Sequence, residues 1–277
     1  MRKKNVIIAF IVLALIPLEW ILILPYVRII PADFHYEATI FSLDNFYNEK
    51  ERHFYGEILS KAKFYYNVID KKGNVLIVKI IFDVRKPTGE QIFLVERIYG
   101  IDRNTGQHIT GYGDRDRTGY LFAPRHANKQ DFVYWHVNYD TPAFMKFQEE
   151  EIIGGLTTYR YQSIYKVDQT TNLYHLPGVP EKMGVEQDVI LTTWVDPETG
   201  FLIKYEDYTT SWYYDIHTKK RIVPWNKFHN EYSYSSVLKK VEMVKQIRFK
   251  VRFLKIYLPV LILFVSFIIL IFGYAKK

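Results

Sequence analysis

The densest group of charged side chains in this sequence lies in a glycine-flanked stretch, where two acids alternate with two arginines. An arginine and a histidine follow soon after. The members of this group are Asp114, Arg115, Asp116, Arg117, Arg125 and His126. Guanidinium groups bind anions through paired N–H donors, so the group predicts a loop that binds an anionic or sugar partner. The simpler interpretation is a solvated turn whose opposite charges pair locally and contribute little to stability.

Other catalytic signatures are absent from the sequence. It contains no Gly-x-Ser-x-Gly elbow, no His-Glu-x-x-His pair and no phosphate-binding Gly-x-x-x-x-Gly-Lys-Ser/Thr loop. The eight histidines are scattered without helical metal spacing, and there is no cysteine to ligate zinc or form a disulfide. We therefore expect no metal, no cofactor and no enzymatic activity, with an unrecognised hydrolase as the remaining alternative.

Two apolar stretches lie near the ends of the 277-residue chain, at residues 6–24 and 256–273. Each approaches the roughly 20 residues that a helix needs to cross a bilayer. The first is longer than the apolar region of a signal peptide, and no small-residue cleavage motif follows it. The sequence thus predicts transmembrane helices over residues 6–27 and 256–274, with short tails at residues 1–5 and 275–277.

The positive charges set the expected orientation. Arg2, Lys3 and Lys4 precede the first span, which places the N-terminus in the cytoplasm. Seven basic residues before the second span favour the reverse, but the first span usually dominates. We therefore expect a two-pass cell-membrane protein with both termini cytoplasmic and residues 28–235 extracytoplasmic.

The positive net charge of the chain comes from the flanks of the two apolar stretches and not from the middle. The net charge is +7, but 12 of the 37 Lys and Arg residues lie in the tails and in residues 239–255. The remaining 25 face 28 acids outside Glu19 and Glu242, so the middle of the chain is slightly acidic. A nucleic-acid-binding surface needs a basic surplus on the folded domain, and we exclude nucleic acid as a partner.

Glu19 is the one charged residue inside the first apolar stretch. A charge at that depth is costly, so two interpretations are open. Its side chain reaches the interface beside Trp20, or it forms an interhelical clamp with Arg252 or Lys255.

Residues 28–235 show the pattern of an antiparallel β domain, with short β-rich runs between turns. We expect a mainly β fold with a half-barrel or barrel-like sheet. The expected strands cover residues 64–70, 75–84, 90–101, 145–153, 156–167, 189–195 and 201–214. Gly154-Gly155 and Gly73-Asn74 predict tight hairpin turns. The motif Asp-x-x-Thr-Gly occurs at Asp102 and Asp196, and it predicts turns rather than calcium loops, because the later acidic ligands are missing.

Residues 236–255 change to helical spacing, with an apolar stripe that begins at Val237 and lysines and arginines on the other side. This basic amphipathic helix lies on anionic headgroups, or it forms a stalk that packs on the β domain and continues into the second span.

Five motifs resemble segments of a largely uncharacterised actinobacterial family that carries the name porin PorA. They are Ile101-Asp102-Arg103-Asn104-Thr105-Gly106, Gly119-Tyr120-Leu121-Phe122-Ala123-Pro124, Asp131-Phe132-Val133-Tyr134-Trp135, Gly155-Leu156-Thr157-Thr158-Tyr159-Arg160-Tyr161 and Thr193-Trp194-Val195-Asp196-Pro197-Glu198-Thr199-Gly200. The resemblance continues through the basic helix and the C-terminal span. A pore needs a closed barrel with lipid-facing strands, whereas the spanning signals here are helical, so we expect no pore.

The expected architecture of two terminal helices and a β-rich outer domain looks like the class B scavenger receptors, which conduct lipid. The Trp-Val-Asp-Pro-x-Thr-Gly turn is similar to turns of periplasmic lipoprotein carriers. Both are analogies of fold. We expect a non-enzymatic domain that binds or transfers membrane lipid or another apolar ligand. The alternative is a structural or adhesion module that docks a surface-layer or envelope protein.

Overall fold

The computed structural model describes residues 3–23, 29–170, 180 and 182–275. The chain divides into two compact units. One unit is Ala32–Glu242, and the other joins Met1–Pro31 with Met243–Lys277.

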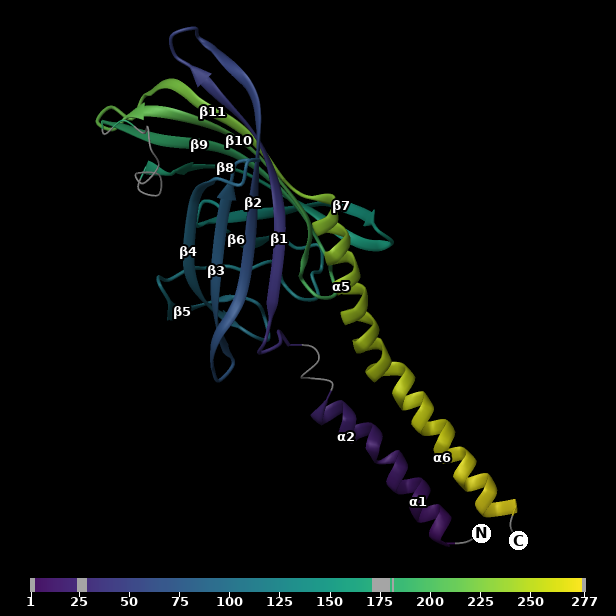
Figure 1. The fold of residues 1–277 in the computed structure, drawn as a ribbon. Coiled ribbons are helices and arrows are strands. Elements are labelled where there is room, and N and C mark those ends of the chain that lie inside the picture. Colours follow the sequence, from purple (N-terminus) through teal and green to yellow (C-terminus); the bar gives the residue numbers. More distant parts are fainter. Residues whose placement is uncertain (1–2, 24–28, 171–179, 181, 276–277) are drawn as a thin grey trace. The chain divides into compact units, whose positions relative to one another are not determined.

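The first unit is built around one antiparallel sheet of eleven strands (Figure 1). Their order across the sheet is β5-β4-β3-β2-β1-β11-β10-β9-β8-β7-β6. The strands are β1 (His35–Asn48), β2 (His53–Lys72), β3 (Val75–Arg85), β4 (Gln91–Asp102), β5 (His108–Gly113), β6 (Phe132–His136), β7 (Thr141–Ile153), β8 (Leu156–Asp168), β9 (Met183–Val195), β10 (Leu202–Asp215) and β11 (Arg221–Tyr232). Only β1 and β11 pair across a long sequence separation, and every other neighbouring pair is consecutive in the chain.

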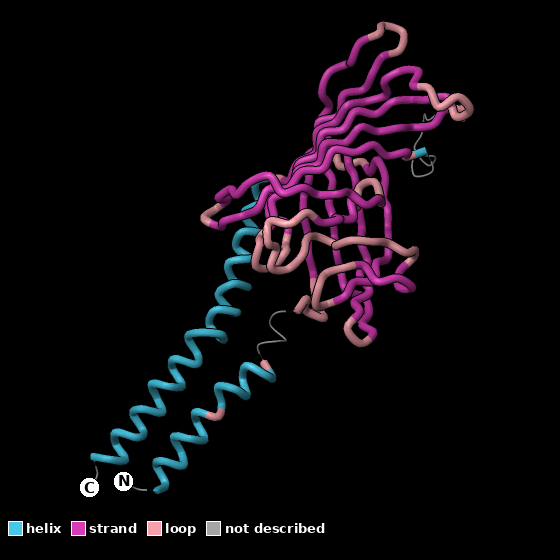
Figure 2. The backbone as a smooth tube through the Cα atoms, turned by 180° about the vertical axis from the view of Figure 1, so that it is seen from behind, coloured by secondary structure: helices cyan, strands magenta, loops and turns pink. Residues whose placement is uncertain are grey.

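Alternation of buried and exposed residues along the strands gives the sheet a core face and a solvent face. On β1, Tyr36, Ala38 and Ile40 are buried, and on β3, Leu76 and Val78 are buried. The sheet twists strongly, so strands β1–β4 run across strands β8–β11 (Figures 1 and 2). Side chains from both halves of the sheet therefore meet on the core face.

The two edges of the sheet are linked through residues 119–121. His108 N–H donates to the Gly119 carbonyl, while the Tyr120 N–H donates to Val133 on β6 at 2.8 Å. Gly119 adopts a φ of +74°, and a Cβ there would lie 2.3 Å from the Val133 carbonyl oxygen. Only glycine allows the segment to approach β6 this closely.

The second unit is helical. It contains α1 (Lys3–Leu13), α2 (Leu15–Leu22), the last residues of α5 (Tyr234–Arg252), the π-helical turn η1 (Phe253–Tyr257) and α6 (Leu258–Ala275). Helices α1 and α6 pack against each other. Many of their apolar side chains remain exposed, such as Phe10 and Phe264.

Among the described residues, one helix has the length and apolar character to cross a membrane, and it covers Tyr234–Phe272. Val6–Leu22 forms a shorter apolar helix. The expected first span over residues 6–27 runs into residues 24–28, which lie outside the described ones, as do residues 1–2 and 276–277 of the tails. Two spans and their orientation therefore stay a prediction.

The mainly antiparallel β fold is confirmed, and each expected strand overlaps an observed one, with two of them predicted to begin one residue too early. The hairpin turns at Gly73 and at Gly154-Gly155 are confirmed by adjacent strand pairing and positive φ angles. At the motif that begins with Asp102, Oδ1 accepts from the N–H groups of Asn104 and Thr105, which makes it a turn. The sequence did not predict β1, β5, β6 and β11.

Candidate functional site

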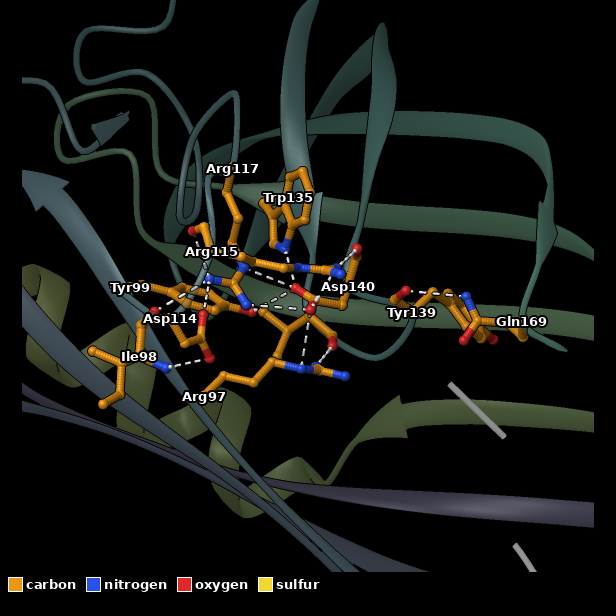
Figure 3. A network of polar contacts seen from close by, with 11 residues as sticks. Arg97, Ile98, Tyr99, Asp114, Arg115, Arg117, Trp135, Tyr139, Asp140 and Gln169 are labelled. Atoms are coloured by element: carbon orange, nitrogen blue, oxygen red, sulfur yellow. Dashed lines mark hydrogen bonds and ion pairs between the residues drawn. The ribbon is translucent and has the colours of Figure 1, made fainter. Parts of the chain in front are cut away.

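Three arginines converge on the carboxylate of Asp140, which lies between β6 and β7 (Figure 3). Arg117 donates from Nε to Oδ1 at 2.9 Å and from Nη2 to Oδ2 at 3.2 Å. Arg97 Nε lies 3.3 Å from Oδ2, Arg115 also pairs with the carboxylate, and Trp135 Nε1 donates to Oδ1 at 2.7 Å. Asp140 therefore connects three segments: the turn after β6, strand β4 and the predicted charged loop.

Arg117 uses its whole guanidinium group inside the protein. Its side chain is 2% exposed and stacks on Tyr99, with 4.1 Å between the guanidinium carbon and the ring centroid. Nη1 donates to Asp114 Oδ1 and, at 3.2 Å, to the Ile98 carbonyl. Arg115 also donates to the backbone carbonyl of Asp140, but its side chain stays about half exposed. Of the two arginines, Arg115 is the one accessible from solvent.

Burial raises the pKa of the Asp140 carboxyl, but hydrogen bonds and positive charge from Arg117, the charge of Arg97 and the bond from Trp135 outweigh it. The net pKa lies below the ordinary value for aspartate, so the carboxylate is charged at neutral pH. His108 lies beside this cluster, with its ring centroid 5.0 Å from that of Tyr99. Burial and the nearby charge of Arg117 lower the pKa of His108 to about 3.

The remaining predicted site residues do not join this cluster. Asp116 Oδ1 accepts from the Gly111 N–H at 2.8 Å, which closes its own loop. Arg125 and His126 lie in the next loop, where the Ala127 N–H donates to the Pro197 carbonyl of the second Asp-x-x-Thr-Gly turn. Burial lowers the pKa of Arg125 to about 10. The structure thus separates the six residues into two loops, and their binding role stays a prediction.

A second polar network lies in the core, around His136 on β6. Its Nε2 lies 2.6 Å from the hydroxyl of Tyr205 and 3.8 Å from Asp207 Oδ2. Tyr205 donates to Asp207 Oδ2 at 3.0 Å, and Tyr139 donates to the same oxygen at 3.1 Å. Burial lowers the pKa of His136 to about 3 and raises that of Asp207, so both groups are biased toward their neutral forms.

Acid–base chemistry needs access to a substrate, and these groups lack it. The side chains of His136 and Asp207 are at most 1% exposed. Their hydrogen bonds instead join β6 to β10, which are distant in the sheet order. Buried polar groups need hydrogen-bond partners, and those of this network come from both strands. The network therefore keeps β6 and β10 close together and so helps to set the curvature of the sheet.

The first turns of α5 are attached to β1 by polar contacts. Ser233 Oγ accepts from the Ser236 N–H and caps the helix, and Ser236 Oγ accepts from the Thr39 N–H at 2.9 Å. Lys240 is buried, with Nζ 3.3 Å from the centroid of the Tyr36 ring, and it donates to the Glu37 carbonyl. Burial lowers the pKa of Lys240 to about 7. Up to this point α5 packs on the β domain.

The solvent face of the sheet carries an apolar row that the sequence analysis did not identify. Six residues lie directly opposite one another on consecutive strands from β2 to β8. We call this set the solvent-face row, and its members are Leu59, Leu43, His229, Tyr208, Ile190 and Ile164. The five members other than His229 are exposed large hydrophobic residues. Contiguous apolar patches of this kind mark interaction sites.

Glu19 lies in α2 and is buried, yet neither of its carboxylate oxygens has a hydrogen-bond partner among the described residues. Arg252 and Lys255 are both exposed. The clamp that the sequence suggested therefore stays a prediction.

Glu19→Gln is the variant that separates the two interpretations. From the unpartnered burial we expect the thermal midpoint of the full chain in nanodiscs to stay level or increase, because a carboxylate without a partner is costly in an apolar environment. Glu242→Gln, on an exposed residue, is the control. A midpoint that decreases only for Glu19→Gln would establish the clamp.

Within the described parts of the chain, no group of three or more His, Asp or Glu side chains is arranged to hold a metal ion. Asp140, His136 and Asp207, at the centres of the two clusters, are buried, whereas Arg115 and most of the solvent-face row are exposed.

A family profile described as Porin PorA matches residues 70–275. It spans most of the chain, from the end of β2 through α6. The chain belongs to the porin PorA family. This matches the resemblance seen in the sequence, and the turns, the β6 segment and the C-terminal helix of this PorA-family chain all lie inside the matched range.

No functionally curated protein matches this PorA-family chain. Among solved structures, one similar chain is described as "Structure of DynF from the Dynemicin Biosynthesis Pathway of Micromonospora chersina". It shares 8% sequence identity with a TM-score of 0.26, and the match covers 74% of this chain and 82% of that chain. A TM-score this low supports no inference about fold or function.

Proposed function

We propose that this PorA-family chain is a membrane-anchored, non-enzymatic β domain that binds or transfers a lipid or another apolar ligand at the cell envelope. The supporting observation is the exposure of apolar side chains along the core face. On β2 the exposed fraction increases from 4% at Ala62 to 54% at Ile58, and on β1 from 2% at Ile40 to 37% at Phe46. The core face is thus uncovered and apolar at the end near the β1–β2 turn, where an apolar chain has a surface to contact.

We call the exposed apolar end of the core face, with Phe46 and Ile58, the rim. Polar groups next to the rim favour an amphiphilic ligand. Ser42 and Ser60 donate to the two oxygens of Asp44 at 3.0 Å and 2.8 Å, and Asp44 pairs with Ile58 in the sheet register. Burial raises the pKa of Asp44. A ligand with hydrocarbon on Ile58 and Phe46 and a hydroxyl or amide near Asp44 satisfies both kinds of surface.

A membrane anchor would keep the β domain at the envelope. The long apolar helix provides one span, and the proposal adds the first span, two cytoplasmic tails and an extracytoplasmic β domain. Envelope lipids are then the most concentrated apolar ligands available to the domain.

Photo-cross-linking in nanodiscs tests the proposal. The probe is a phospholipid with a diazirine in its acyl chain, and mass spectrometry locates the cross-links in the full chain. We expect cross-links on peptides with Phe46 and Ile58, besides those on α1 and α6. Ile58→Asp should reduce the rim cross-links at least tenfold, since it places a charge against the hydrocarbon.

Ile152→Asp is the matched control, because Ile152 is an exposed isoleucine on another strand. It should leave the rim cross-links unchanged. The helix cross-links serve as the internal standard for lipid labelling. Labelling confined to the helices would refute ligand binding by the β domain.

A second candidate function is docking of an envelope protein by a structural or adhesion module. The solvent-face row is the observation that favours it, because five of its six side chains are exposed and apolar. A photoreactive amino acid at the position of Tyr208 in intact cells should produce a discrete protein adduct. The same group at the exposed Ile152 is the control, and equal labelling at both positions would argue against a specific partner.

A further inference from the structure

We infer that the solvent-face row is a self-association surface, which binds the same row of a second copy of this chain. This rests on the second candidate function, and it names the partner. The register of six consecutive strands aligns the apolar side chains of the row. The charges that flank them form a self-complementary pattern.

The centre of the row is rigid and aromatic. Tyr208 on β10 and His229 on β11 are register partners, and their rings stack with centroids 4.0 Å apart and an interplanar angle of 8°. Leu43 continues the row on one side and Ile190 on the other. Tyrosine is one of the residue types enriched in binding hot spots.

The charges that flank the row decide which partner fits. Residues two positions before and after each row member point to the same face. On β11 these are Lys227 and Glu231, and on β2 they are Glu57 and Lys61. On each of the other four strands, these flanking positions hold at most one charged residue. Neither Lys227 nor Glu231 forms a salt bridge among the described residues, and Lys227 Nζ lies 4.7 Å from the centroid of the Phe54 ring.

A twofold axis along the row makes this pattern self-complementary. Such an axis places each strand opposite its own copy in the reverse direction, so Lys227 of one chain faces Glu231 of the other, and Lys61 faces Glu57. No strand then places two like charges opposite each other. An isologous interface requires this kind of self-complementarity, whereas an unrelated partner does not.

Sheet packing geometry identifies the pair that matters most. Two packed sheets cross at about 30°, so strands far from the centre diverge. β11 is one of the two central strands of the six, whereas β2 is at one end of them. The contacts between Lys227 of one copy and Glu231 of the other therefore lie near the point where the two sheets cross, and they form despite the divergence of the outer strands. Tethering in one membrane raises the effective concentration, which allows a modest interface to associate.

Charge reversal on β11 tests the arrangement in liposomes, with the full chain labelled at a single cysteine introduced at the exposed Asn104. Energy transfer between donor- and acceptor-labelled chains reports association. We expect transfer for the natural sequence, and at least a tenfold weaker association for Lys227→Glu alone and for Glu231→Lys alone. An equal mixture of the two variants should restore the transfer, because each Glu again faces a Lys. Lys72→Glu is the charge-reversal control outside the row.

Each outcome decides the inference. Rescue by mixing supports it, and because an unfolded variant cannot be rescued, the mixture also controls for folding. Absence of transfer in the natural sequence, full transfer in either single variant, or a mixture as weak as its components would overturn it. If transfer is absent but the photoreactive group at position 208 captures a different protein, docking stands and self-association fails. If neither occurs, both fail.

Discussion

Asp140→Asn is expected to lower the free energy of unfolding by about 3–5 kcal/mol, because it removes the carboxylate that bonds two nitrogens of the buried Arg117 and leaves Asp114 as its described carboxylate partner. Arg117 has a side chain that is 2% exposed, and two of its nitrogens bond Asp140. Asparagine keeps the shape of the side chain and tolerates the φ of +49° at this position. The decrease in the free energy of unfolding therefore measures the loss of the carboxylate charge and not a strain in the backbone.

Chemical denaturation of the full chain in nanodiscs, followed by tryptophan fluorescence, measures this effect. The matched control is Asp188→Asn, since Asp188 also pairs with an arginine, Arg221, but on a partly exposed surface. That variant should cost at most about 1 kcal/mol. Equal losses in both variants would show that burial around Asp140 contributes nothing special.

The stability of the β domain should decrease in acid partly through His108, and His108→Phe should remove that part of the dependence while the part due to His136 stays. The pKa of His108 is lowered to about 3 in the folded protein, whereas an unfolded histidine titrates near 6.5. Between these values the unfolded state binds a proton that the folded state does not, so stability decreases as the pH falls. The expected loss is about 2 kcal/mol between pH 6.5 and pH 5.0 from this group alone.

Phenylalanine suits the site, because the His108 ring centroid lies 5.0 Å from that of Tyr99 and 5.8 Å from that of Trp135. Its Nε2 has no hydrogen-bond partner in the described part of the chain. At pH 7.5 the variant should match the natural sequence within about 1 kcal/mol. Denaturation at pH 7.5 and at pH 5.0 gives the difference for each protein. His53→Phe, on an exposed histidine, is the control. An unchanged acid loss in His108→Phe would refute the assignment.

The sequence predicted the strands whose apolar residues alternate and whose turns contain glycine. β3 and the β7–β8 hairpin are examples, since Gly154 and Gly155 both have positive φ. It did not predict β11, which contains Pro224, Asn226, Lys227 and Asn230 among its residues. β11 pairs with β1, and nearly the whole length of the domain separates the two strands along the chain. A local sequence pattern does not show which distant strand will pair with it.

The candidate site was predicted only in part, for a similar reason. The arginines of the charged loop were visible, but Asp140 was not, because it lies more than 20 residues further along the chain. The solvent-face row was invisible as well. Each of its members is a single apolar residue in a strand, and only the register of six strands brings them into line.

The link through residues 119–121 has a consequence for contacts between copies of this chain. Unpaired strand edges recruit strands from neighbouring molecules, and β5 and β6 are the edges of this sheet. Because Tyr120 bonds β6 on one side while Gly119 accepts from His108 on the other, those backbone groups are already occupied. Copies that meet are thus hindered from joining edge to edge through these groups, and contact between them is left to the faces of the sheet.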